Sequence, residues 1–344
     1  MALKTVTRLG KTWLLLLFIA MTFTLIQSAK GATLIITLNT SKPSYSLGEQ
    51  VSIFGNITLD GAVVSDALVA IEVDDPEGNH IILRTSSTGT IPTGFDVEIL
   101  SVTPCDQAGN PKNSFNVGTL AFFRITLYNN GPIPKYTVIS LNVFDAKQVP
   151  FEALVIFRGL IYLGTTDMLV PVDIPLQASI GYAVLYANAY TELPKNNGVA
   201  HCPEKSTTFA IIAGGGGGKT AEDGSYVSSE STGSLYYLTG SEGTYTLDFR
   251  LTRTRGKIGN YTTYVSATYQ TQTATNTTTF HVFLEGDLNG DNIVDMKDIG
   301  IATRAFGSTP GHPRWDPVAD VNHDLKVDMK DIGIVIRNFG KSAS

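Results

Sequence analysis

The sequence is poor in charge, in cysteine and in histidine. Of its 344 residues only 16% are charged, two are cysteines and five are histidines, and the net charge is -6. A nucleic-acid-binding domain carries clustered lysine and arginine, and the chain has no such cluster, so we expect no nucleic-acid partner. The scattered histidines contain no His-Glu-x-x-His pair, which excludes that class of zinc hydrolase. Hydrophobic residues make up 43% of the chain, enough for two or three domains with buried cores.

Helical periodicity is also scarce. Between Ala32 and Glu285 no long segment repeats its apolar residues at helical spacing. Apolar and polar residues instead alternate in short runs, as around Phe123, Ile125 and Leu127. This alternation is typical of antiparallel strands with one buried face, and two stacked sheets are the usual way to bury such faces. We therefore predict a mainly β chain with two Ig-like or fibronectin-like antiparallel β-sandwiches.

The number of candidate strands suggests how the chain is divided. About four precede residue 88, about seven follow in the next segment and about three come at the end of the β region. Neither four nor three strands close a core alone, so we expect the first and last groups to form one sandwich. The predicted segments are a discontinuous sandwich (32–88 plus 241–284), an inserted sandwich (94–213) and a flexible Gly/Ser-rich linker (214–240). A contact between the strands at 50–58 and 260–269 is expected.

The N-terminus has the pattern of an export signal. Three basic residues precede an apolar stretch from Trp13 to Ile26, and small residues follow it, so we predict a signal peptide at 1–31. The apolar stretch is short for a membrane span, although an uncleaved anchor is the alternative. We predict a secreted or cell-surface location, and in such a protein each Asn-x-Ser/Thr triplet is a candidate glycosylation site. These asparagines are Asn39, Asn56, Asn260 and Asn276.

The two cysteines are interpreted in the light of export. Cys105 and Cys202 have only one intramolecular connectivity, and an exported protein meets an oxidising environment, so we predict a disulfide between them. The alternatives are a nucleophilic cysteine beside His201 and a pair of metal ligands.

Two oxygen-rich loops near the C-terminus are the strongest pattern in the chain. Each has carboxylate or amide oxygens at loop positions 1, 3, 5, 9 and 12, and a backbone carbonyl is the usual ligand at position 7, as in calcium loops of the EF-hand type. The first loop contains Asp287, Asn289, Asp291, Ile293, Asp295 and Asp298, and the second contains Asp320, Asn322, Asp324, Lys326, Asp328 and Asp331. We therefore predict two bound Ca²⁺ ions.

The sequences that follow the loops are duplicated. Val-Asp-Met-Lys-Asp-Ile-Gly-Ile begins at Val294 and again at Val327, and apolar residues continue at helical spacing to Gly307 and Gly340. A strand-like segment, 277–283, precedes the first loop, so each unit has an exit helix but no helix before the loop.

A duplicated loop and exit helix closely resembles a dockerin type I module, here at 286–340. The resemblance implies a calcium-ordered pair of helices that docks onto a cohesin-like domain of another protein. It also implies recognition residues at equivalent places of the two repeats, namely Met296, Lys297 and Arg304, then Met329, Lys330 and Arg337. The symmetry predicts two docking orientations. Loop position 6 needs a positive φ, which Asn292 adopts more readily than Leu325, so we expect the second loop to be weaker or differently bent.

The β region has more diffuse resemblances. Residues around Lys42–Gly48 and Gly243–Tyr261 resemble macroglobulin-like or bacterial Ig-like domains of exported proteins. The run Phe122–Tyr128, followed by Asn129–Gly131, resembles CARDB and fibronectin-like adhesion modules, especially archaeal ones.

Two other patterns have simpler interpretations. Gly214–Gly218 followed by Lys219 and Thr220 is similar to a phosphate loop, but no helix pattern follows and we interpret it as a hinge. Asp74, Asp75 and Glu77 flank Pro76 and Gly78, and we interpret them as a turn, with metal binding as the alternative.

Three functions are compatible with these patterns. We expect a non-catalytic exported protein whose sandwiches are adhesive or spacer modules. The alternatives are an enzyme or accessory component of a polysaccharide-degrading complex, and a carbohydrate-binding protein, with extracellular glycan as its partner, whose calcium module is a structural cap. An enzyme is disfavoured because the carboxylates of the β region are spread out, at Asp96, Glu98, Asp145, Glu152, Asp167 and Asp173.

Overall fold

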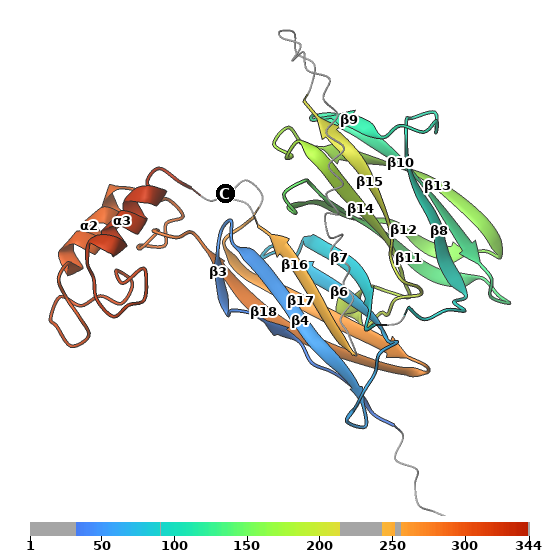
Figure 1. The fold of residues 1–344 in the computed structure, drawn as a ribbon, viewed down its shortest axis with the longest axis horizontal. Helices are drawn as coiled ribbons and strands as arrows, with labels where there is room; N and C mark the ends of the chain where they lie inside the picture. The colour runs from blue at the N-terminus through green and yellow to red at the C-terminus, as the bar shows by residue number, and fades with distance from the viewer. Residues whose placement is uncertain (1–31, 90, 214–242, 252–255, 343–344) are drawn as a thin grey trace, which may run out of the picture. The chain divides into compact units, whose positions relative to one another are not determined.

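A computed structural model describes residues 32–89, 91–213, 243–251 and 256–342 (Figure 1). The predicted signal peptide and the whole predicted linker, which includes the phosphate-loop-like segment, lie outside these residues. The described chain consists of β-strands followed by two α-helices near the C-terminus, which confirms the predicted mainly β class. Within the described residues, no helix combines the length and the hydropathy that crossing a bilayer requires.

The first sandwich has two five-stranded sheets that bury alternate residues between them. Strand order is β1-β4-β16 in one sheet, where β2 and β5 also pair with β4, and β3-β18-β17-β6-β7 in the other. The strands of the first sheet are β1 (Leu34–Ile36), β2 (Asn39–Thr40), β4 (Gln50–Leu59), β5 (Ala62–Val63) and β16 (Thr244–Arg250). The strands of the second sheet are β3 (Ser44–Ser46), β6 (Leu68–Asp74), β7 (His80–Ser87), β17 (Gly259–Tyr269) and β18 (Gln272–Phe283).

Strands from both ends of the β region pair with each other in this sandwich. In one sheet β4 pairs with β16, with Ile53 opposite Leu247, and in the other β6 pairs with β17, with Ile71 opposite Val265. The strands at 50–58 and 260–269 lie in different sheets and do not pair. They meet as expected through the core, because their buried side chains, such as Ile53 and Tyr261, belong to one hydrophobic cluster.

The second sandwich is formed by the intervening chain. Its sheets have the orders β13-β10-β8 and β12-β11-β14-β15-β9. The strands are β8 (Val97–Cys105), β9 (Ser114–Asn116), β10 (Thr119–Asn129), β11 (Lys135–Phe144), β12 (Pro150–Ile161), β13 (Gly164–Ile174), β14 (Gly181–Tyr190) and β15 (Lys205–Ile212). Alternate residues of β10, including Phe123 and Ile125, are buried, and the ring of Phe123 lies 5.1 Å from that of Phe209 in an edge-to-face contact.

Strand β7 joins the two sandwiches. The side-chain amides of Asn142 and Asn188 bond to the backbone of Leu83 at 3.2 and 2.9 Å. The buried guanidinium of Arg84 donates two hydrogen bonds to Glu204 and lies 3.3 Å from the ring centre of Tyr186. Because these buried polar groups are paired across the junction, the outward face of β7 is part of the interior of the molecule.

The predicted disulfide is wrong, because Cys105 and Cys202 are both free and buried. Cys105 ends β8 and lies opposite Phe122, whereas the thiol of Cys202 bonds to the backbone of Ile99. Six residues of extended strand separate Ile99 from Cys105, a span of about 20 Å, whereas bridged Cα atoms lie within about 7 Å. Burial raises the pKa of Cys202 to about 12, which also disfavours a nucleophilic thiol.

The two helices begin at the duplicated sequences. Helix α2 spans Met296–Ala305 and α3 spans Met329–Asn338, and a single 3₁₀ turn, η1, spans Pro194–Asn196. Asp295 and Asp328 cap their helices, each accepting a hydrogen bond from the backbone two residues on. Gly307 and Gly340 follow the helices with φ near 77°, a conformation that glycine adopts without strain.

Candidate functional site

The first oxygen-rich loop closes around its own carboxylates. Asp287 accepts hydrogen bonds from the backbone of Gly290 and Asn292, both at 2.8 Å, and Asn289 accepts one from Asp291 at 2.9 Å. These contacts fold the loop back on its first residue, and the next contact, from Ile293 to Asp291, continues the same pattern. The loop therefore gathers side-chain oxygens from positions 1, 3 and 5.

The last carboxylate of each loop is the most deeply buried. Asp298 and Asp331 are inaccessible to solvent. Asp298 accepts from Leu288 at 2.8 Å and from Asp295 at 2.8 Å, so it joins the loop's start to the helix N-terminus. Asp331 accepts from Asn322 at 3.2 Å, as Asp298 does from Asn289, and from Asp328 at 2.8 Å. Since a buried carboxylate needs compensating positive charge, its position fits a cation ligand.

Both loops adopt the same conformation at position 6. Asn292 has φ 67° and Leu325 has φ 66°. The expectation that the second loop is differently bent is therefore wrong, because closure of the loop imposes the left-handed conformation whatever residue occupies the position. The isobutyl side chain of Leu325 carries the strain that Asn292 avoids. A weaker second site stays a prediction.

The charge of each loop fits a hard divalent cation. All its side-chain donors are oxygens, which calcium prefers, and the carbonyls of Ile293 and Lys326 occupy position 7. Lysine partly neutralises each loop, since Lys297 lies 2.9 Å from Asp291 and Lys330 lies 3.2 Å from Asp324. The hydrogen bond from Lys297 lowers the pKa of Asp291 below its usual value, so the carboxylate is charged and ready to bind a cation.

Each loop is also held by the far end of the other repeat. Val294, at position 8 of the first loop, exchanges backbone hydrogen bonds with Gly340 and Lys341, the residues after α3. Val327, at position 8 of the second loop, bonds in the same way to Gly307 and Ser308, the residues after α2. Order in one loop therefore supports the helix of the other repeat.

The residues predicted to contact a partner lie on the surface of the two helices. Met296 and Met329 start the helices and are 67% and 65% exposed, whereas methionine side chains are more often buried. Sequence reasoning did not assign to the partner surface four further exposed apolar residues of the same module, Phe306, Val318, Ile336 and Phe339. Ile336 follows Met329 by seven residues, so helical periodicity places both on one face. This spacing is the sequence pattern that identifies Ile336 as a surface residue. The other predicted residues, Lys297, Arg304, Lys330 and Arg337, are exposed as well.

The candidate glycosylation sites all lie on the first sandwich. Asn39, Asn56 and Asn260 are exposed, whereas Asn276 is half-buried and its amide donates to the carbonyl of Ile36 at 2.9 Å. The first three therefore meet the steric requirement for a glycan better than the fourth.

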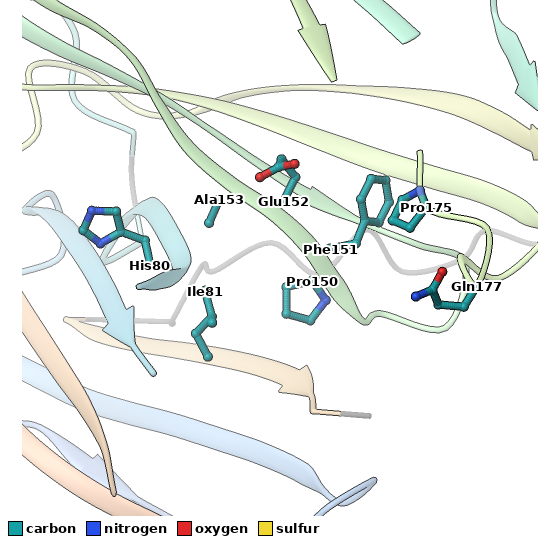
Figure 2. Close-up of a pocket in the computed structure, with 8 residues that line it drawn as sticks. All are labelled: His80, Ile81, Pro150, Phe151, Glu152, Ala153, Pro175 and Gln177. Atoms are coloured by element: carbon teal, nitrogen blue, oxygen red, sulfur yellow. The ribbon is translucent and has the colours of Figure 1, made fainter. Parts of the chain in front are cut away.

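A pocket of about 340 Å³ lies where β7 meets the second sandwich (Figure 2). His80 and Ile81 come from β7, and the opposite residues come from the start of β12 and the turn after β13. The lining residues from the second sandwich are Pro150, Phe151, Glu152, Ala153, Pro175 and Gln177.

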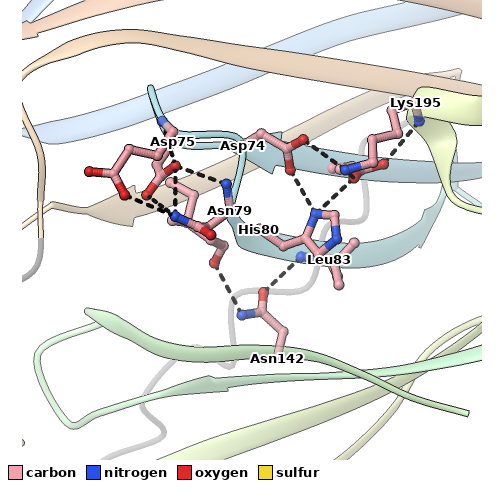
Figure 3. A network of polar contacts seen from close by, with 10 residues as sticks. Asp74, Asp75, Asn79, His80, Leu83, Asn142 and Lys195 are labelled. Atoms are coloured by element: carbon pink, nitrogen blue, oxygen red, sulfur yellow. Dashed lines mark hydrogen bonds and ion pairs between the residues drawn. The ribbon is translucent and has the colours of Figure 1, made fainter.

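Beside this pocket is a polar network that was only partly anticipated (Figure 3). Asp75 accepts from the backbone of Glu77 and Asn79, both at 2.9 Å, which confirms the predicted turn. Asp74, in contrast, faces His80 and Lys195. Hydrogen bonds to Asp74 and then to Glu72 raise the pKa of His80 to about 9.

Glu72 and His80 were missed, although strand geometry identifies them. Glu72 and Asp74 are two residues apart on β6 and so share a face, and His80 lies directly opposite Asp74 on β7.

Comparison with known proteins identifies the C-terminal module. Residues 285–340 match the dockerin type I domain family, which confirms the predicted resemblance. Domains of this family bind calcium and dock onto cohesin domains. No curated protein matches the chain.

Solved structures resemble only part of the chain. The CARDB domain of a Pyrococcus furiosus protein, solved with di-metal ions, is 12% identical, with a TM-score of 0.25 and coverage of 36% of this chain and 99% of that one. An alkylpurine DNA glycosylase of Pseudomonas fluorescens is 15% identical, with a TM-score of 0.27 over 35% of this chain and 31% of that one. A β-glucosidase of Listeria innocua is 11% identical, with a TM-score of 0.24 over 36% of this chain and 16% of that one. The chain thus spans under a third of the length of both enzymes.

Proposed function

We propose that the chain is an exported, non-catalytic modular protein that docks onto a cohesin-like domain of another protein through two calcium-ordered loops and their helices. Its sandwiches act as adhesive or spacer modules on the cell surface or in a secreted assembly. One Ca²⁺ ion binds to each loop.

The observation that carries this proposal is the duplicated exposed face of a dockerin module. Methionine and lysine recur at the start of α2 and α3, and arginine recurs in the last turn of each helix. Exposed methionine beside a cation suits a protein interface, where the apolar side chain is buried and the charge lies at the rim. The loops fix the two helix starts, so calcium controls whether both faces are presented together.

The non-catalytic part rests on how the carboxylates of the second sandwich are used. Asp145 accepts from the backbone of Lys147, Val149 and Ser179, so it stabilises a turn. Asp96 pairs with Lys135 at 2.6 Å, and Asp167 accepts from Thr126 at 2.6 Å. Each of these groups has a local structural role, which favours a binding module over a hydrolase with paired carboxylates.

A capture experiment tests the proposal. The full exported chain is immobilised with calcium, with EDTA, and as the Asp287→Ala/Asp320→Ala variant, and exported proteins of the host are applied. We expect one cohesin-like protein, identified by mass spectrometry, to bind only the wild type with calcium, and that protein is then expressed alone and its affinity measured. Asp316→Ala, at a half-buried aspartate of the same module outside the loops, is the matched control. Direct binding that survives EDTA would contradict the proposal.

Carbohydrate binding is the second candidate, because the second sandwich exposes aromatic rings. Tyr182 on β14 is 77% exposed and Tyr162, between β12 and β13, is 67% exposed. Exposed rings of this kind can stack on sugars. Retention on insoluble polysaccharide in EDTA, lost on Tyr182→Ala, would favour a glycan-binding protein in which the calcium module is a structural cap.

A further inference from the structure

Three potential metal ligands converge at the junction of the two sandwiches. The Nδ1 atom of His80 lies 2.7 Å from Oδ1 of Asp74 and 2.9 Å from Oε1 of Glu72. One ligand atom from each of these residues lies within 4.8 Å of the others. The three come from β6 and β7, far along the chain from the calcium loops, and differ from them in offering an imidazole nitrogen.

One oxygen of this group lacks a hydrogen bond. Glu72 is inaccessible to solvent, and its Oε1 atom accepts no hydrogen bond of good geometry, although Nδ1 of His80 lies 2.9 Å away and the ammonium of Lys195 lies 3.5 Å away. The imidazole nitrogen carries at most one proton, which is directed to Asp74. A buried carboxylate oxygen that is close to two other ligand atoms and has no well-directed donor is poorly satisfied by a proton alone.

The other two carboxylate oxygens are fixed by Lys195 (Figure 3). The backbone N–H of Lys195 donates to Oε2 of Glu72 at 2.9 Å, and its ammonium donates to Oδ2 of Asp74 at 3.2 Å. Each carboxylate therefore has an outer oxygen held by Lys195 and an inner oxygen directed at the imidazole. Metal sites have this arrangement, in which neighbours orient the ligands and leave one atom of each for the ion.

We propose that Glu72, Asp74 and His80 bind a divalent first-row transition-metal ion, separately from the two calcium loops. In octahedral coordination, two ligands about 2.1 Å from an ion and at right angles lie about 3.0 Å apart, close to the 2.7 and 2.9 Å between these atoms. Two carboxylates and one imidazole suit zinc, cobalt or manganese better than calcium, which takes oxygen ligands. The ion takes the place of the proton shared between the imidazole and the carboxylates.

The charge and position of the site suit such an ion. Binding of the ion releases the proton of His80, after which two carboxylates and one ammonium leave a net negative charge that partly balances the cation. The imidazole of His80 is 21% exposed and lines the pocket of Figure 2, which gives solvent access to an otherwise buried group. Because Lys195 belongs to the second sandwich and the three ligands to the first, a bound ion also strengthens the junction.

Cobalt and zinc titrations test the site directly. The full exported chain is saturated with calcium, so that the C-terminal loops are filled, and Co²⁺ or Zn²⁺ is added alone. We expect one ion per chain, with a Co²⁺ absorption band that reports a nitrogen ligand and a rise in the thermal unfolding midpoint. Glu72→Gln, which keeps the side-chain shape, and His80→Ala should each weaken binding by about 10-fold or more.

Two matched controls separate the site from adventitious binding. Glu77 is an exposed acid of the adjoining turn, and His281 is an exposed histidine of the same sandwich. Glu77→Gln and His281→Ala should bind Co²⁺ as the wild type does. Absence of Co²⁺ binding to the calcium-saturated protein, or equal binding by wild type and Glu72→Gln, would overturn the proposal. Neither result bears on docking, which is measured with calcium alone.

Discussion

The two oxygen-rich loops have the same backbone conformation at position 6 although the side chains there differ. At position 6 an asparagine in one repeat and a leucine in the other have φ angles within a degree of each other. The buried last aspartate and the lysine pair are also the same in both. The comparison shows that the hydrogen bonds to the aspartates at positions 1 and 12 determine how the loop closes. The residue at position 6 changes only the free energy of closure.

The two helices differ at three equivalent positions, two of them buried and one exposed. The buried differences are Ala302 in α2 against Val335 in α3, and Ala305 against Asn338. On the outward face, seven residues after the shared methionine, Thr303 of α2 corresponds to Ile336 of α3, and both are exposed. The module therefore departs from symmetry in its packing and also, at one position, in the face that it offers to a partner.

Calcium removal should have the largest effect on both repeats. Ions present at 1,000 times their Kd contribute about 4 kcal/mol per site, and without them the carboxylates of each loop repel one another. We expect EDTA to abolish the helical circular dichroism of α2 and α3 while the strand signal persists. Limited proteolysis should then cut within 287–340.

Single-loop variants sharpen that prediction. Because Val294 and Val327 link each loop to the other repeat, Asp287→Ala should also loosen α3, and Asp320→Ala should loosen α2. Hydrogen exchange of the two helices measures this. Protection that is lost in only the mutated repeat would show that the repeats order independently.

Removing the buried last aspartate should have the next largest effect. Asp298→Ala leaves the backbone N–H groups of Leu288 and Asp295 without their acceptor, at a cost of about 3 kcal/mol. Asp331→Ala should cost a similar amount because it also removes the acceptor of two backbone N–H groups, those of Asn322 and Asp328. The unfolding midpoint of the calcium-loaded module measures both, with Asp316→Ala, outside the loops, as the control. A marked difference between Asp298→Ala and Asp331→Ala would show that the repeats are not energetically equivalent.

Relief of backbone strain at position 6 should stabilise its loop, by less than the loss of the buried aspartate destabilises it. Leu325→Gly removes a left-handed leucine and should stabilise the second loop by about 1 kcal/mol, an approximately 5-fold gain in calcium affinity. Asn292→Leu should weaken the first loop by a similar factor. Calorimetric titration resolves the two sites. If Leu325→Gly leaves the weaker site unchanged, the unequal side chains do not set the affinities.

The sequence predicted the parts of the molecule that depend on local spacing. The closure of the oxygen-rich loops, the helix starts and the alternation of the strands follow from residues close along the chain. The pairing of β4 with β16 was not predictable in detail, because alternation gives the buried face of a strand but not its neighbour.

The errors have the same origin. Two cysteines suggested a bridge, but their separation depends on where β8 and the segment after η1 lie in the fold. The convergence of Glu72, Asp74 and His80 combines spacing within β6 with the register of a hairpin that has an irregularity at Asp74. Lys195 could not be assigned to this group from the sequence at all, because it comes from the other sandwich.

The smallest expected effect tests the symmetry of docking. If both orientations are equivalent, Met296→Ala/Lys297→Ala removes one of two and halves the association constant, a change of about 0.4 kcal/mol. Because Ile336 gives the α3 face more apolar surface than Thr303 gives the α2 face, we expect less than a two-fold loss here and several-fold loss for Met329→Ala/Lys330→Ala. Surface plasmon resonance with the captured cohesin-like domain measures both. A collapse of affinity in the first variant alone would contradict two orientations, since the intact α3 face should still support docking.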